Sequence, residues 1–107
     1  MEISQRENGV SSEVQISGRI DAAEAERFEL ELTRAEARAP ETLAVDLSDV
    51  DHLDSSGLAV LVRAWRRTSA AGIRFTLVLP SDEQAQRIFT LTGFDTVFDI
   101  SEPSRRH

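Results

Sequence analysis

Apolar and polar residues alternate over residues 13–20 (EVQISGRI). This period of two predicts a strand with one buried face and one wet face. Residues 2–7 (EISQRE), joined to it through Asn8-Gly9, are typical of an antiparallel hairpin partner. Residues 42–47 (TLAVDL) are almost continuously apolar, which indicates a buried central strand. Two further strands are expected at residues 74–79 (RFTLVL) and 96–100 (TVFDI).

The segments between these strands repeat their apolar residues at helical spacing. The first helix is predicted to begin at Asp21, where Glu24 completes a capping-box pattern with aspartate in place of serine or threonine, and to end near residue 40. A second helix should begin around residues 55–56 and stop at Gly72.

A third helix is expected after Pro80, with Ser81 as its N-cap, Gln84 three residues later and Gly93 at its end. The spacing predicts inner faces made of Ala25, Phe28, Leu32, Ala35, Leu58, Leu61, Val62, Trp65, Ala85, Ile88 and Phe89. The other aromatic residues, Phe75, Phe94 and Phe98, are also expected in the core, and not as a platform for stacked bases.

These elements follow the order β-β-α-β-α-β-α-β, which predicts an α/β fold. Alternating strands and helices require parallel pairing through crossovers, while the first hairpin makes the sheet mixed. The wet face of residues 13–20 indicates that the helices pack mainly on one face. We expect one domain over residues 1–107, with its core at about 13–100 and a flexible tail at 101–107.

The composition excludes several classes of function. A formal net charge of −7 argues against nucleic-acid binding and against acidic membrane surfaces. The chain has no cysteine and two histidines, so a metal centre or a cofactor is not expected. Residues 1–10 lack the apolar core of a signal peptide, and no stretch has the length of a membrane span. We therefore expect a cytoplasmic protein. Because a domain of this size shows no evident large exposed apolar stripe, we also expect it to be monomeric when free.

The stretch DSSGL (54–58) is the strongest candidate for chemistry. If Asp54 or Ser55 caps the second helix, Ser56 lies in its first turn, where free N–H groups and the helix dipole favour negative charge. Gly57 would then let another molecule's backbone approach Ser56. Three interpretations stay open on local pattern: two serines that only cap the helix, a catalytic nucleophile, and a serine that receives phosphate.

Local features weigh against the nucleophile. The stretch lacks the glycine that stands two residues before the serine in a nucleophile elbow. His52 is near in sequence, but such proximity does not establish triad geometry.

Two groups of charged residues flank this stretch. The arginines at 63, 66 and 67 suggest a solvated helix exterior or a basic docking patch. The aspartates at 46, 49, 51 and 54 lack the spacing of a calcium loop, which favours a solvated acidic face.

Three segments together resemble the STAS domain, named for sulfate transporters and anti-sigma factor antagonists. They are SGRIDAAEAERF, LAVDLSDVDHLDSSGLAVLVRAWRR and GIRFTLVLPSDEQAQRIFTLTGFDTVFDI, and the resemblance runs from about Val14 to Ile100. Its most specific part is VDLSDVDHLDSSGL. The resemblance implies a mixed sheet with helices mainly on one face, and it is greatest for the small free-standing bacterial anti-sigma factor antagonists.

This resemblance also implies a function that is not enzymatic. Such antagonists bind an anti-sigma factor, a serine kinase with an ATP-binding fold of the histidine-kinase type, and thereby release a sigma factor. The kinase phosphorylates the serine before the glycine, here Ser56, and a PP2C-type phosphatase restores it. Asp21 matches a kinase-docking position, and the rest of the partner-binding loop matches Asp54, Ser55, Gly57 and Leu58. The alternative is a STAS accessory subunit that docks on the ATPase of a membrane transporter.

Overall fold

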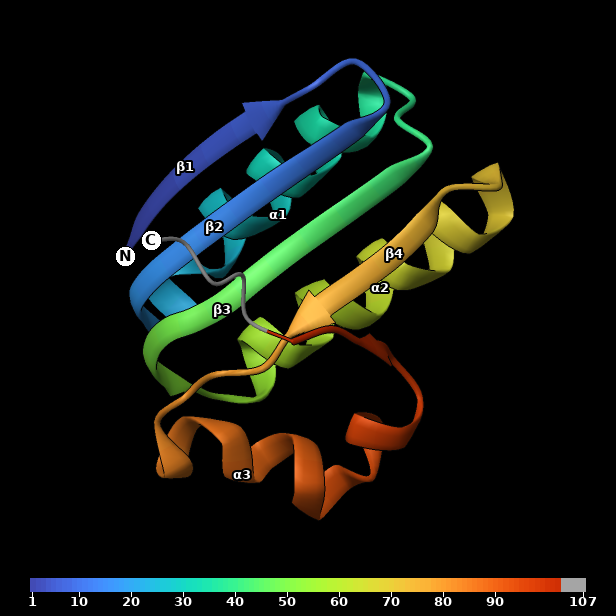
Figure 1. The fold of residues 1–107 in the computed structure, drawn as a ribbon. Coiled ribbons are helices and arrows are strands. Elements are labelled where there is room, and N and C mark those ends of the chain that lie inside the picture. The colour runs from blue at the N-terminus through green and yellow to red at the C-terminus, as the bar shows by residue number, and fades with distance from the viewer. Residues whose placement is uncertain (103–107) are drawn as a thin grey trace.

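Five strands form one mixed sheet in the computed structural model, which describes residues 1–102 (Figure 1). Their order across the sheet is the same as their order along the chain: β1 (Glu2–Glu7), β2 (Ser11–Ile20), β3 (Thr42–Leu53), β4 (Arg74–Val78) and β5 (Asp99–Ile100). β1 pairs antiparallel with β2, and every other neighbouring pair is parallel. The predicted α/β class and mixed sheet are confirmed.

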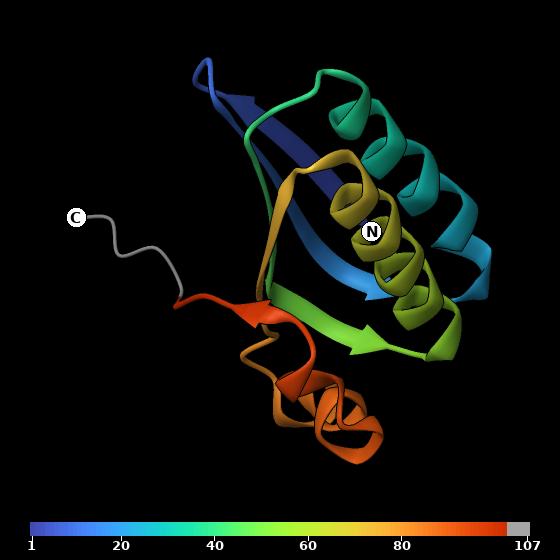
Figure 2. The same cartoon turned by 90° about the vertical axis from the view of Figure 1, so that its right-hand side faces the viewer.

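Three helices connect the parallel strands: α1 (Ala22–Ala37), α2 (Ser55–Ala71) and α3 (Glu83–Thr92). Figure 2 shows α1 and α2 side by side on the same face of the sheet. α3 lies beyond the carboxyl ends of the central strands, where it contacts β3 and the short 3-10 helix η1 (Phe94–Thr96) (Figure 1). The prediction that helices pack mainly on one face is therefore confirmed.

The hydrophobic core fills the space between the sheet and its helices. The predicted alternation of β2 holds, because Val14, Ile16 and Ile20 are fully buried and the residues between them are not. Near α3 the core is aromatic: the ring of Phe98 lies 5.9 to 6.4 Å, centroid to centroid, from four other rings. These four rings belong to Trp65, Phe75, Phe89 and Phe94.

β3 continues to Leu53, six residues beyond the predicted end of the strand. Its second half pairs with β2 through two register shifts, between Gln15 and Ser17 and between Gly18 and Arg19. At each shift β3 has one residue more than β2 between successive pairs, which is the pattern of a bulge. The bulges let the polar segment after residue 47 stay hydrogen-bonded, and they carry β3 to the edge where α2 begins.

Two boundaries near the C-terminus differ from the prediction. Asp82, not Ser81, is the N-cap of α3, and its Oδ1 accepts hydrogen bonds from the N–H groups of Gln84 (2.9 Å) and Ala85 (3.0 Å). The strand predicted at 96–100 is shorter, because residues 94–96 form η1 and only Asp99–Ile100 pair with β4. Of the predicted tail, residues 103–107 lie outside the described part of the chain.

Candidate functional site

The carboxyl ends of β2 and β3 place two helix N-termini next to each other. Ile20 and Leu53 are paired at the end of these strands, and the Asp54 N–H donates to the Ile20 carbonyl at 3.4 Å. One residue after each strand stands an aspartate N-cap, Asp21 for α1 and Asp54 for α2. Since the strands are parallel, both caps lie at the same edge of the sheet. The predicted docking residue Asp21 is therefore brought to the serine turn.

Asp21 is only partly exposed and is held by its surroundings. Its Oδ1 accepts from the Ala23 N–H at 3.1 Å, and its Oδ2 lies 3.6 Å from Arg19 Nε. The predicted N-cap is confirmed. Glu24 pairs with Arg27 at 3.8 Å.

The serine turn is the first turn of α2, and its two serines differ in environment. Ser55 is exposed, while Ser56 is half-buried. The Ser56 hydroxyl donates a hydrogen bond of 2.5 Å to Asp54 Oδ1. The same oxygen accepts from the backbone N–H groups of Ser56 (3.0 Å) and Gly57 (3.4 Å). A hydroxyl has one proton to donate, so Ser56 has a carboxylate and not the His52 imidazole as its acceptor.

These hydrogen bonds set the electrostatics of Asp54. The bond from the Ser56 hydroxyl is the largest cause that lowers the pKa of Asp54 below its usual 3.8. Partial burial opposes it, while the two backbone N–H groups and the charge of His52 add to the lowering of the pKa. Asp54 is therefore ionised at neutral pH, and α2 begins with a fixed negative charge beside the Ser56 hydroxyl.

Gly57 is required by the fold itself. It is buried against the ends of β2 and β3, where an added Cβ would meet the side chains of Leu53 and Ile20. Glycine is thus required so that α2 can approach its own sheet. Leu58 is 6% exposed and belongs to the core cluster. Both residues pack toward the core and so fix the position of the serine turn on the sheet.

A shallow apolar groove of about 340 Å³ adjoins the serine turn along α2. Its lining residues are Ser55, Leu58, Ala59, Val62, Arg63, Arg66 and Phe94. Ser55 therefore connects the serine turn to an apolar surface. Among the predicted site residues, the structure brings Asp21, Asp54, Ser55 and Ser56 together at the surface.

The arginines of α2 are not a uniformly solvated exterior. Arg67 Nε lies 2.7 Å from Glu36 and its Nη2 atom 2.8 Å from Glu29, both on α1. Arg63 Nε also pairs with Glu29, at 2.7 Å. This cluster, called the α1–α2 ion bridge below, was not predictable from local pattern because it depends on how the two helices lie side by side. Arg66 is exposed at the groove.

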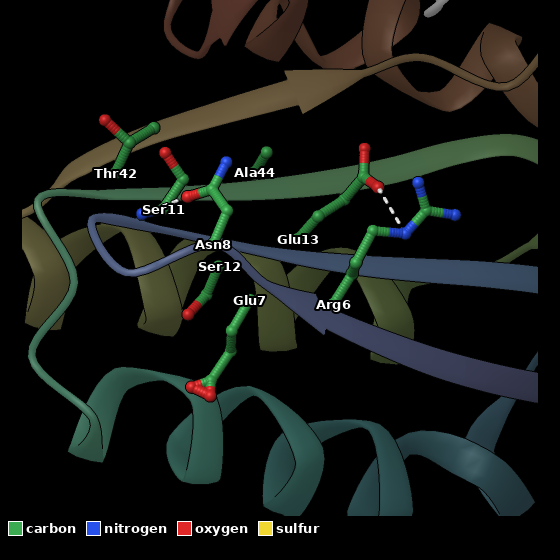
Figure 3. Close-up of a pocket in the computed structure, with 8 residues that line it drawn as sticks. All are labelled: Arg6, Glu7, Asn8, Ser11, Ser12, Glu13, Thr42 and Ala44. Atoms are coloured by element: carbon green, nitrogen blue, oxygen red, sulfur yellow. Dashed lines mark hydrogen bonds and ion pairs between the residues drawn. The ribbon is translucent and has the colours of Figure 1, made fainter. Parts of the chain in front are cut away.

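A second hollow, of about 250 Å³, lies at the opposite end of β2 (Figure 3). It is lined by the hairpin and the start of β3, and its polar groups interact with one another. Arg6 lies 4.0 Å from Glu13, and Asn8 Oδ1 accepts from the Ser11 N–H at 3.0 Å. Since this hollow is at the far end of the strands from Ser56, it forms no part of the serine site.

The acidic residues before α2 do not form a metal site: within residues 1–102, no group of three or more possible ligands is close enough to hold an ion. Asp49 and Asp51 are exposed, while Asp46 is buried and accepts from the Ser48 N–H at 2.9 Å.

Within residues 1–102, no helix combines the length and the apolar character that crossing a bilayer requires.

Comparison with known proteins agrees with this geometry. The STAS domain model matches residues 3–105. The anti-sigma-B factor antagonist of Bacillus subtilis is 31% identical over 104 residues, which cover 97% of this chain and 92% of that protein. An anti-sigma factor antagonist from Mycobacterium paratuberculosis has a TM-score of 0.82 at 28% identity, over 96% of this chain and 86% of that one.

More distant structures show the same fold. The anti-sigma factor antagonist SpoIIAA in its unphosphorylated form has a TM-score of 0.80 at 16% identity, over 97% of this chain and 90% of that one. The phosphorylated form of SpoIIAA from Bacillus has a TM-score of 0.74, over 97% and 93% of the two chains. With its sheet order, its DSSG turn at the start of α2 and a family match over nearly its whole length, the chain belongs to the STAS domain family.

Proposed function

We propose that this protein is an anti-sigma factor antagonist that acts by partner switching in the cytoplasm. Unphosphorylated, it binds an anti-sigma factor that is a serine kinase with an ATP-binding fold of the histidine-kinase type, and a sigma factor is released. The kinase inactivates it by phosphorylating Ser56, and a PP2C-type phosphatase restores it. The supporting observation is the Ser56 hydroxyl at the first turn of α2, in a chain similar over 97% of its length to such an antagonist.

The surface around Ser56 suits a protein partner. Asp21 and Ser55 flank the turn, and the apolar groove along α2 begins at Ser55. Asp54, Gly57 and Leu58 contribute by fixing the turn, since their side chains or backbone pack inward or cap the helix. In this function the chain is a substrate of the kinase and turns over no substrate of its own.

Phosphorylation would act on this surface through charge and volume. A phosphate adds about −1.5 to −2 charge units. The helix N-terminus can hold part of that charge, but Asp54 is in direct contact with the Ser56 oxygen and Asp49 and Asp51 lie in the preceding segment. A partner packed on the turn would have to bury the dianion near these carboxylates. A penalty of about 3 kcal/mol corresponds to roughly 100-fold weaker binding.

The test compares Ser56→Ala and Ser56→Asp with wild type in binding to the cognate kinase loaded with ADP. Ser56→Ala should bind like wild type, and Ser56→Asp at least tenfold more weakly. Ser69→Asp is the matched control, because it adds the same charge at an exposed position of α2 far from the serine turn, and it should bind like wild type. With ATP, mass spectrometry should find phosphate on Ser56. Equal binding by Ser56→Ala and Ser56→Asp would contradict the proposal that charge at Ser56 weakens binding to the kinase.

A further inference from the structure

The two serines of the turn differ in what they contact, and this difference goes beyond exposure. Ser55 is the more exposed, yet among residues 1–102 its side chain makes no hydrogen bond. The half-buried Ser56 donates its proton to Asp54 Oδ1 at 2.5 Å. If accessibility alone selected the phosphate acceptor, Ser55 would be preferred. The structure instead distinguishes Ser56 by an attached carboxylate.

A serine hydroxyl that attacks phosphorus must lose its proton, and the acceptor has to be within hydrogen-bond reach. In protein kinases with a Gly-rich loop, an aspartate of the kinase accepts the proton of the substrate hydroxyl, whereas the kinase proposed here has a fold of the histidine-kinase type. Asp54 has the required position in the acceptor protein itself. It is ionised at neutral pH, and the two backbone N–H groups at 3.0 and 3.4 Å fix its carboxylate relative to Ser56.

We propose that Asp54 takes part in the phosphorylation of Ser56, as the group that orients the Ser56 hydroxyl and accepts its proton. This inference rests on the proposed function. In the step, a lone pair of Ser56 Oγ forms a bond to the γ-phosphorus of ATP. The bond from that phosphorus to the bridging oxygen breaks, ADP leaves with the electron pair, and the hydroxyl proton moves to Asp54 Oδ1. Asp54 thereby also selects Ser56 over Ser55.

Asp54→Asn separates this role from helix capping. Asparagine caps a helix as well as aspartate does, and its Oδ1 can still accept from the N–H groups of Ser56 and Gly57. It cannot take a proton at neutral pH. The matched control is Asp82→Asn, because Asp82 Oδ1 caps α3 with the same two kinds of bond, to Gln84 and Ala85, and no serine follows it in that turn.

The experiment measures single-turnover phosphorylation of wild type, Asp54→Asn and Asp82→Asn by excess cognate kinase with ATP, using intact-protein and peptide mass spectrometry. Asp54→Asn should lose about 100-fold in maximal rate. Its half-saturating kinase concentration, its binding to the ADP-loaded kinase and its thermal midpoint should stay close to wild type. Asp82→Asn should be phosphorylated at the wild-type rate.

The outcomes separate the two proposals. Phosphorylation of Asp54→Asn at the wild-type rate would place the proton acceptor on the kinase and overturn this inference, while the proposed function stands. A loss confined to binding or to thermal stability would show a merely structural role and overturn it as well. Failure of wild type to bind the kinase or to gain phosphate on Ser56 would overturn the proposed function, and the role of Asp54 with it.

Discussion

Gly57 packs directly against Ile20: a Cβ atom on residue 57 would lie 2.9 Å from Ile20 Cγ2. Ile20 is fully buried at the end of β2, so it has little room to move. This contact is what brings the first turn of α2 onto the carboxyl ends of β2 and β3. The position of Ser56 at the surface thus depends on Gly57, which is itself buried.

Gly57→Ala should destabilise the fold by about 1 to 2 kcal/mol, because overpacking outweighs the gain in helix propensity. Chemical denaturation measures the change. Ser55→Ala, at the exposed neighbouring position, should change the free energy of unfolding by less than about 0.5 kcal/mol. Equal stability of Gly57→Ala and wild type would show that Ile20 and Leu53 can yield without cost.

The α1–α2 ion bridge predicts a pH dependence of stability. Burial acts to raise the pKa of Glu29, but hydrogen bonds and charge from Arg67 and Arg63 outweigh it, so the pKa lies below its usual 4.5. A lowered pKa in the folded state stabilises the fold above pH 4.5, and this contribution is lost as the pH falls through the folded-state pKa.

Glu29→Gln should therefore lower the stability at pH 7 by about 1 kcal/mol, and this difference from wild type should shrink as the pH is lowered from 5 toward about 3. Urea denaturation over this pH range measures it. Glu26→Gln, an exposed position on the same helix, is the control. A pH-independent difference between Glu29→Gln and wild type would mean that the ion pairs do not carry the effect.

Removing the Ser56 hydroxyl should change the titration of Asp54. Because the hydrogen bond from Ser56 is the largest cause of the lowered pKa, Ser56→Ala should raise the pKa of Asp54 toward 3.8. Carboxyl carbon NMR titration of both proteins measures this, with the Asp82 resonance as an internal reference. Identical titration of Asp54 in the two proteins would indicate that the hydroxyl points elsewhere in solution.

Asp21 combines a capping role with a predicted docking role, and two substitutions separate them. Asp21→Ala should cost about 1 kcal/mol of stability, because the bond to the Ala23 N–H is lost. Asp21→Asn should retain the cap and remove only the charge. If the charge contacts the kinase, both variants should bind it more weakly in calorimetry. Wild-type affinity of Asp21→Asn would confine Asp21 to capping.

Phe98 is the centre of the aromatic part of the core, and Phe98→Leu should leave a cavity there. We expect a loss of about 1 to 2 kcal/mol in stability. The fluorescence of Trp65, the one tryptophan of the chain, should also change because its ring lies 6.1 Å from that of Phe98. Emission spectra and denaturation check both effects. The control is Phe28→Leu, on the buried face of α1, which should change stability without altering the Trp65 emission.

Local pattern was sufficient for the element order because periodicity and caps are short-range signals. It did not predict element boundaries that are determined by contacts between segments distant in the sequence. Ser81 and Asp82 are both good caps, but the Ser81 N–H is bound to the Ser48 carbonyl at 3.2 Å, which ties Ser81 to β3 and leaves the cap to Asp82. The extension of β3 likewise depends on pairing with β2, which no pattern within residues 48–53 reveals.

The serine site was located by the DSSG motif, but the motif could not say what each residue does. The role of Gly57 follows from its distance to Ile20, and the difference between the serines follows from the side-chain direction of Ser56. Both depend on three-dimensional packing. The assignment of Ser56 as the phosphate acceptor stays a prediction.

The α1–α2 ion bridge has a consequence for recognition. Arg67 joins Glu29 and Glu36 of α1 to the helix that starts with the serine turn, while α1 itself starts at Asp21. This bridge fixes the two helices side by side, and the paired ends of β2 and β3 hold their starts, so that together they form one preorganised platform. A binding partner would meet a surface that is already ordered, so association would lose little conformational entropy in fixing it.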